Sequence, residues 1–195
     1  TIPRIELERA YKSVERDELA TARAVEQPRA VVLGGQPGSG KSGLAYEATK
    51  ELSKEGGSVL IDADRMRENN PQYKALLKTD PQNAADKTQA EAGAWSNRLT
   101  VAAMESKRNL VIDGTMRSPE NIKALAEGLR DNGYKVDVRV MAVPEDVSMA
   151  RARLRFEEQA AENGHGRFVN KAQHDAAYQG MPATVKMLER EKLAD

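Results

Sequence analysis

Residues 34–42, with the sequence GGQPGSGKS, constrain this chain more than any other stretch. From Gly35 onward they match the pattern G-x-x-x-x-G-K-[S/T], which is typical of a phosphate-binding loop. Before them, residues 30–33 form an apolar run typical of a buried strand, and residues 44–48 after them have a helical composition. We therefore predict a strand, a phosphate loop and a helix N-terminus in that order. The alternative is a glycine-rich turn before an ordinary helix.

The residue types of this loop explain why it would bind a nucleoside triphosphate. Glycines let successive backbone N–H groups and the positive end of the helix dipole approach a phosphate closely. Lys41 would reach the β- and γ-phosphates, and the Ser42 hydroxyl would be a ligand of Mg²⁺. The predicted cofactor-binding residues are Gly35, Gln36, Pro37, Gly38, Ser39, Gly40, Lys41, Ser42 and Gly43.

Length and composition narrow the class of protein. The 195 residues suit one α/β domain, and 30 basic residues balance 30 acidic ones, so we expect neither a nucleic-acid partner nor an anionic membrane surface. The sequence has no cysteine, two histidines, no apolar run long enough to span a membrane and no signal-peptide pattern. We expect a soluble, cytoplasmic protein. Because the chain begins at Thr1, it is either processed after an initiator methionine or cut from a longer chain.

Strands alternating with helices predict a P-loop type of parallel sheet flanked by helices on both faces, with additional helices at both termini. Residues 1–28 are expected to form a helical N-terminal extension of a single domain covering residues 1–195, either packed on the outside of the sheet or serving as a docking surface. The further strands are predicted at residues 58–61, 109–112 and 134–143, and helices at 83–107 (interrupted at Gly93), 119–132, 144–162 and beyond 167. Residues 65–80 are expected to be irregular.

Carboxylates follow two of the predicted strands. Asp62 and Asp64 follow residues 58–61, and Asp113 follows residues 109–112. The carboxyl ends of parallel strands form the edge where ligands bind. Asp64 is the first choice for a general base, with Asp62 as an alternative, although Asp64 could instead be a helix N-cap. Asp113 could hold Mg²⁺ through water or lie in an Asp–Gly turn.

Other side chains are weaker candidates. Thr115 and Arg117 follow Asp113 and could contact an acceptor substrate, while Arg155 and Arg167 could clamp triphosphate oxygens or be solvated surface arginines. Trp95 is expected in the core, with stacking on a base as the alternative.

The order of these motifs resembles the zeta toxin family, P-loop kinases of bacterial toxin–antitoxin systems. The resemblance covers residues 31–182. Besides the phosphate loop, it depends on IDAD (61–64), NPQY (70–73), WSNRLT (95–100), VIDGTMR (111–117), VMAVP (140–144), RFE (155–157) and GRF followed by QHD (166–168 and 173–175).

The resemblance implies an enzyme that transfers the γ-phosphate of ATP or GTP, with Mg²⁺, to the 3′-hydroxyl of the amino sugar of UDP-N-acetylglucosamine, which blocks peptidoglycan synthesis. By motif, Asp64 matches the general base, and Lys41, Arg155 and Arg167 match groups that stabilise the transferred phosphate. The positions that match the sugar-nucleotide pocket are Asp64, Asn97, Arg98, Asp113, Thr115 and Arg117.

The chain departs from the family pattern at two positions. Val101 stands where the family has a substrate-binding glutamate, and Asp113 stands where the strand-end acid is commonly glutamate. An isopropyl group cannot accept hydrogen bonds from sugar hydroxyls. A kinase acting on a dinucleotide or another small metabolite is therefore one alternative, and a non-catalytic nucleotide-binding switch is another.

The family also implies a partner. A free kinase of this kind would harm its own cell, so a neutralising antitoxin protein is expected. Alternatively, residues 2–27 could be the remnant of a self-inhibitory segment.

Overall fold

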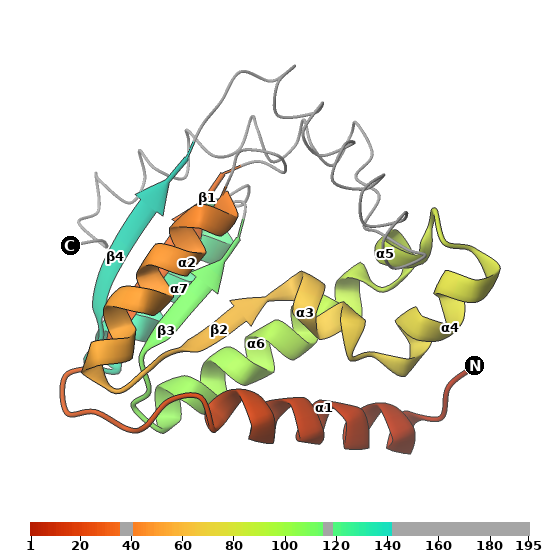
Figure 1. Cartoon of the computed structure of the whole chain (residues 1–195), viewed down its shortest axis with the longest axis horizontal. Helices are drawn as coiled ribbons and strands as arrows, with labels where there is room; N and C mark the ends of the chain where they lie inside the picture. Colours follow the sequence, from red (N-terminus) through yellow and green to blue (C-terminus); the bar gives the residue numbers. More distant parts are fainter. Residues whose placement is uncertain (36–40, 115–118, 142–195) are drawn as a thin grey trace.

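A four-stranded parallel sheet forms the centre of the computed structural model, which describes residues 1–35, 41–114 and 119–141. The strands are β1 (Arg29–Gly34), β2 (Val59–Asp62), β3 (Leu110–Asp113) and β4 (Lys135–Val140), arranged in the order β2-β3-β1-β4 (Figure 1). Every adjacent pair is parallel. The predicted α/β class is confirmed, and each predicted strand is present with ends displaced by one or a few residues.

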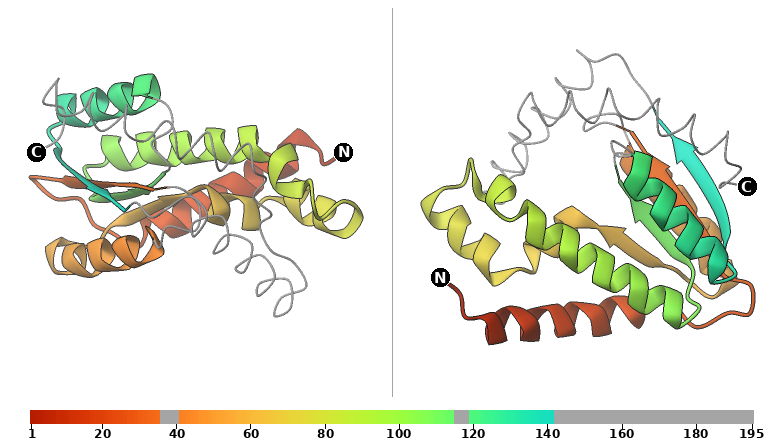
Figure 2. Two further views of the ribbon diagram at one scale, coloured as in Figure 1. Left: turned by 90° about the horizontal axis from the view of Figure 1, so that it is seen from above. Right: turned by 180° about the vertical axis from the view of Figure 1, so that it is seen from behind.

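Helices cover both faces of the sheet (Figure 2). On one face, Val31, Leu33 and Val111 pack against Ala48 and Leu52 of α2. The alternate strand residues face the other side, where they pack against α6 and α7. The helices are α1 (Arg4–Leu19), α2 (Lys41–Leu52), α3 (Ala63–Glu68), α4 (Pro71–Thr79), α5 (Ala84–Lys87), α6 (Gln89–Glu105) and α7 (Pro119–Asp131), with a 3-10 turn at Ser53–Glu55.

Helix α1 is packed into the same core through Tyr11. The Tyr11 ring is fully buried and meets Trp95 of α6 edge to face, with the ring centroids 5.5 Å apart. The guanidinium of Arg98 lies 3.7 Å from the centroid of the Tyr11 ring and is held by both carboxylate oxygens of Glu8. Trp95 is therefore a core residue, as predicted.

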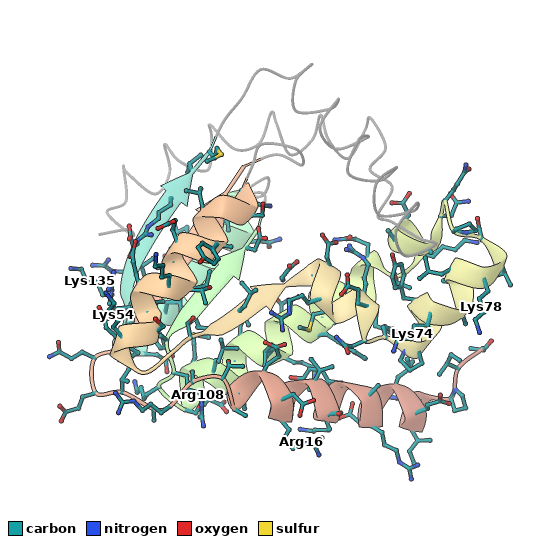
Figure 3. The ribbon with its side chains drawn as sticks, viewed as in Figure 1. Arg16, Lys54, Lys74, Lys78, Arg108 and Lys135 are labelled. Atoms are coloured by element: carbon teal, nitrogen blue, oxygen red, sulfur yellow. The ribbon has the colours of Figure 1, made fainter. Side chains whose placement is uncertain are left out.

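The connection from α1 to β1 is held by contacts with distant segments. Isolated β-bridges join Ala22 to Gly57 and Ala24 to Arg108. Arg108, labelled in Figure 3 near the end of α1, donates its Nε to the carbonyls of Leu19 and Ala22, at 3.1 and 3.0 Å. These contacts fix where β1 begins, and therefore where the phosphate loop follows it.

The expectation that residues 65–80 are irregular is wrong, because the segment contains most of α3 and all of α4. The side chain of Asn70 accepts a hydrogen bond from the backbone N–H of Gln72, and Pro71 occupies the first turn of α4. Proline is favoured at that position because its missing N–H has no partner there in any helix. The Asn–Pro pair therefore marks the start of a helix.

The predicted interruption at Gly93 is also wrong. Helix α6 runs through Gly93 without a break, and the chain breaks instead at Thr88, between α5 and α6. The Thr88 hydroxyl donates to the carbonyl of Ala84 at 2.7 Å. A single glycine costs a helix only about 1 kcal/mol, which the packing of Trp95 and Leu99 in the core outweighs.

Candidate active site

The carboxyl ends of β1, β2 and β3 lie together at one edge of the sheet (Figure 1). Asp113, the last residue of β3, is in register with Leu33 on one side and with Asp62 on the other. Asp113 therefore closes the strand, directly before Gly114. The first residue after β1, Gly35, has a φ of +150°, a conformation that favours glycine.

Lys41 reaches this edge from the first turn of α2. Its Nζ lies 2.9 Å from Asp113 Oδ1 and donates a hydrogen bond to the carbonyl of Gly114, also at 2.9 Å. Ser42 and Gly43 follow on the exposed start of the helix. A helix N-terminus with a lysine directed at the strand ends is the arrangement that the motif predicts for triphosphate binding.

Asp62 caps helix α3. Its carboxylate accepts a hydrogen bond from the backbone N–H of Asp64 at 2.9 Å, so the cap is Asp62 and not Asp64. Burial, followed by the negative charges of Asp64 and Asp113, raises the pKa of Asp62 to about 6. The opposing influence of Lys41 is smaller. The edge is therefore rich in negative charge and oxygen ligands.

Asp64 lies in the first turn of α3, with 38% of its side chain exposed. Arg67 Nη1 lies 2.5 Å from Asp64 Oδ1. The other terminal nitrogen of Arg67 donates to Oε1 of Gln89, the first residue of α6. Asp64 is thus an accessible carboxylate supported by a buried arginine.

This support is not predicted by the sequence. Arg67, Gln89 and Glu91 belong to none of the quoted motifs, and Asn70, the first residue of the NPQY motif, donates from its side chain to Glu91 in a second link to α6. The spacing of Asp64 and Arg67, three residues apart with opposite charges, was the available signal, since such residues are neighbours on a helix. Nothing in the sequence pattern indicates the pairing with α6.

The residues of α6 that match the family's sugar-nucleotide pocket lie on its exposed surface. Asn97 and Arg98 are exposed, and Arg98 pairs with Glu8 of α1. Val101 is 46% exposed. The role of Asn97 and Arg98 in substrate binding stays a prediction.

Several predicted site residues lie outside the described ranges. They are the phosphate-loop residues Gln36, Pro37, Gly38, Ser39 and Gly40, the loop residues Thr115 and Arg117, and the arginines Arg155 and Arg167, together with the helices expected from residue 144 onward.

The donor atoms at the edge suit Mg²⁺ and a triphosphate. Asp113 Oδ1 is buried and accepts no hydrogen bond from the described residues, although it is close to Lys41 Nζ. Carboxylate and hydroxyl oxygens are the ligands that Mg²⁺ prefers, usually with several waters retained. In ranges 1–35, 41–114 and 119–141, no group of three or more acidic or histidine side chains is arranged to hold a metal by itself.

None of the helices in the described part of the chain is long and apolar enough to cross a membrane.

Solved structures of other proteins are similar to this chain over most of its length. A structure from the PezAT chromosomal toxin–antitoxin system of Streptococcus pneumoniae matches with a TM-score of 0.84 at 25% identity, covering 100% of this chain and 76% of the other. A structure of AvrRxo1-ORF1:AvrRxo1-ORF2 with ATP matches with a TM-score of 0.69 at 13% identity, covering 93% of this chain and 58% of that one. The second match shows a shared fold.

Comparison with curated proteins identifies relatives by sequence. Toxin zeta of Enterococcus hirae is 32% identical over 173 residues, covering 86% of this chain, and toxin PezT of Streptococcus pneumoniae is 30% identical over 154 residues, covering 78%. The chain spans about three fifths of their length, 58% and 60%. The family model described as zeta toxin matches residues 12–195. With the phosphate-loop lysine, the strand-end aspartates and the sheet order all in place, the chain belongs to the zeta toxin family.

Proposed function

We propose that this chain is a kinase that transfers the γ-phosphate of ATP or GTP to the 3′-hydroxyl of the amino sugar of UDP-N-acetylglucosamine. The observation that carries the proposal is the approach of Lys41, Asp64 and Asp113 to one sheet edge from three separate elements. A phosphate-binding lysine beside an accessible carboxylate is what transfer to a hydroxyl requires. The family and the solved toxin–antitoxin structure support the class of reaction.

In the proposed reaction, Asp64 accepts the proton of the sugar hydroxyl while its oxygen attacks the γ-phosphorus. The bond between that phosphorus and the β–γ bridging oxygen breaks, and the nucleoside diphosphate leaves. Lys41 binds the phosphate oxygens, and we assign the same role to Arg155 and Arg167 by motif. Ser42 would hold Mg²⁺, which neutralises the charge that builds up on the leaving oxygen.

The test uses purified protein with Mg²⁺-ATP and UDP-N-acetylglucosamine, and follows the sugar nucleotide by mass spectrometry. We expect a gain of one phosphoryl group. Asp64→Asn removes the proton acceptor and should lower the transfer rate by at least about 100-fold, while the dissociation constant for ATP stays nearly unchanged. An unchanged transfer rate in Asp64→Asn would contradict the assignment of Asp64 as the base.

The valine at position 101 supports a different acceptor molecule as the alternative. Its exposed isopropyl group cannot make the hydrogen bonds of the glutamate that the family resemblance implies at this position. If UDP-N-acetylglucosamine gains no mass while ATP still binds, a dinucleotide or another small metabolite becomes the candidate acceptor. Mass analysis of a metabolite pool after incubation with Mg²⁺-ATP would identify it. Triphosphate turnover that depends on an acceptor would also exclude a non-catalytic switch.

We also propose that an antitoxin protein neutralises this chain in the cytoplasm, where nucleoside triphosphates are available. The solved relative comes from a toxin–antitoxin system. Self-inhibition by residues 2–27 is the alternative, and it predicts that their deletion raises activity. However, α1 contributes the fully buried Tyr11 to the core, so the deletion needs a control for folding.

A further inference from the structure

Helix α3, which carries Asp64, is too short to be stable without contacts to other elements. Helix α3 has six residues, and helices this short are not stable in isolation. The cap by Asp62 satisfies the backbone N–H of Asp64 and does not restrain its side chain. Contacts with the rest of the molecule must therefore set where the Asp64 carboxylate lies.

Arg67 contacts the carboxylate from within the same helix, and its second contact ties the pair to the rest of the molecule. The two side chains lie one turn apart on α3, with Nη1 and Oδ1 2.5 Å apart. Only 2% of the Arg67 side chain is exposed, compared with 38% for Asp64. The arginine therefore holds the carboxylate from its buried side.

The second contact of Arg67 links this pair to the core. Its Nη2 donates to Gln89, at the start of the 17-residue helix α6. Helix α6 is anchored by the buried side chains Trp95 and Leu99. A guanidinium can hold two partners at once because its donors form a rigid planar fork, which an ammonium group lacks.

We infer that Arg67 is a positioning residue for the base, fixing the Asp64 carboxylate relative to α6. The inference builds on the proposed function, because it takes Asp64 as the base. A buried charge is a costly way to join two helices, and apolar residues of similar volume often stabilise a fold as well or better. The placement of a charge here is therefore explained by what it does to Asp64.

The neighbouring link between Asn70 and Glu91 supplies a matched control. It joins the α3–α4 segment to the same end of α6, and in the described structure neither Asn70 nor Glu91 makes a hydrogen bond to Asp64. Glu91→Met breaks this link, while Arg67→Met breaks the link that holds Asp64. If Arg67 only joined the two helices, Arg67→Met and Glu91→Met would change stability and activity to a similar extent.

Three measurements are made on the full chain: urea unfolding, steady-state kinetics, and the χ1 rotamer populations of Asp64 from NMR scalar couplings. For Arg67→Met we expect an unfolding transition close to that of Glu91→Met, a kcat about 100-fold below wild type, and a KM for ATP within about twofold. We expect one dominant Asp64 rotamer in the wild type and in Glu91→Met, and averaged rotamers in Arg67→Met. Arg67→Lys should recover about tenfold in kcat, because an ammonium can pair with Asp64 without bridging to Gln89.

An unchanged Asp64 rotamer in Arg67→Met would overturn the inference, as would equal losses of kcat in Arg67→Met and Glu91→Met. The rotamer measurement needs no acceptor. If the wild-type protein fails to phosphorylate UDP-N-acetylglucosamine, the proposed acceptor is wrong, and the rotamers still decide whether Arg67 positions Asp64.

Discussion

Asp62 caps the short helix α3 with a carboxyl group whose ionisation is unfavourable. Its carboxylate holds the N-terminus of α3, but it lies partly buried beside Asp64 and Asp113. Removing a carboxylate from water and surrounding it with like charges both disfavour ionisation. In this chain, three carboxylates are therefore gathered where a bound cation would relieve their repulsion.

Asp62→Asn should stabilise the protein at neutral and alkaline pH. The folded pKa of Asp62 is raised from 3.8 to about 6, so the folded state resists ionisation that the unfolded chain accepts. The stability contributed by the neutral carboxyl is full below about pH 4 and is lost as pH rises through about 6. At about 1.4 kcal/mol per pH unit, the gain at pH 8 is at most about 3 kcal/mol. Asparagine also preserves the helix cap.

Urea unfolding at pH 4.5 and pH 8 checks this prediction. The advantage of Asp62→Asn should shrink as the pH falls. Glu47→Gln, a charge-neutralising change at an exposed position of α2, is the control and should alter stability little at either pH. A difference between Asp62→Asn and wild type that stays constant with pH would contradict the raised pKa.

At the scale of the elements, α1 is part of the core although it precedes the first strand. Tyr11 is fully buried between Trp95 and the guanidinium of Arg98. The helix also contributes Val14 to the same cluster. Its removal would expose the face of α6 that carries Trp95.

Tyr11→Ala should lower the free energy of unfolding by about 4 kcal/mol, because the substitution leaves a cavity beside Trp95 and removes the contact with Arg98. Tyr46→Ala is the matched control, since Tyr46 is 67% exposed on α2 and its loss should cost less than about 0.5 kcal/mol. Equal unfolding midpoints for the two variants in a urea titration would show that α1 is not part of the cooperative core.

The elements also show what a sequence can predict. The strands and α2 were predictable because apolar runs and the phosphate-loop motif are local signals, and the parallel arrangement placed Asp62, Asp64 and Asp113 at one edge. Helix α3 was missed because it is short and forms through tertiary contacts. The pairing of Arg67 with Gln89 spans 22 residues and depends on how α3 packs on α6, which no local pattern records.

At the scale of the whole molecule, the site is assembled from segments distant in the chain. Lys41 comes from α2, Asp64 from α3 and Asp113 from β3, and the sheet order brings them together. A ligand at this edge would contact several elements at once and should therefore stabilise the whole fold.

Mg²⁺-ATP should raise the free energy of unfolding by about 2.7 kcal/mol at a concentration 100 times its dissociation constant. Thermal unfolding with and without nucleotide checks this. Lys41→Met should remove most of the shift at the same ATP concentration, because the phosphates lose the ammonium group of Lys41. Adenosine, which has no phosphates, should produce little shift with wild-type protein. A shift of the same size in Lys41→Met would place the nucleotide elsewhere.

The ion pair of Lys41 with Asp113 would give an incoming triphosphate a competitor for the ammonium. The ammonium is already neutralised at 2.9 Å and already satisfies the carbonyl of Gly114. An incoming triphosphate would meet an ammonium whose charge is already paired, so the net attraction it gains would be smaller than with an unpaired lysine. Movement of Lys41 toward the phosphate would in turn leave the carboxylate of Asp113 free to take a new partner.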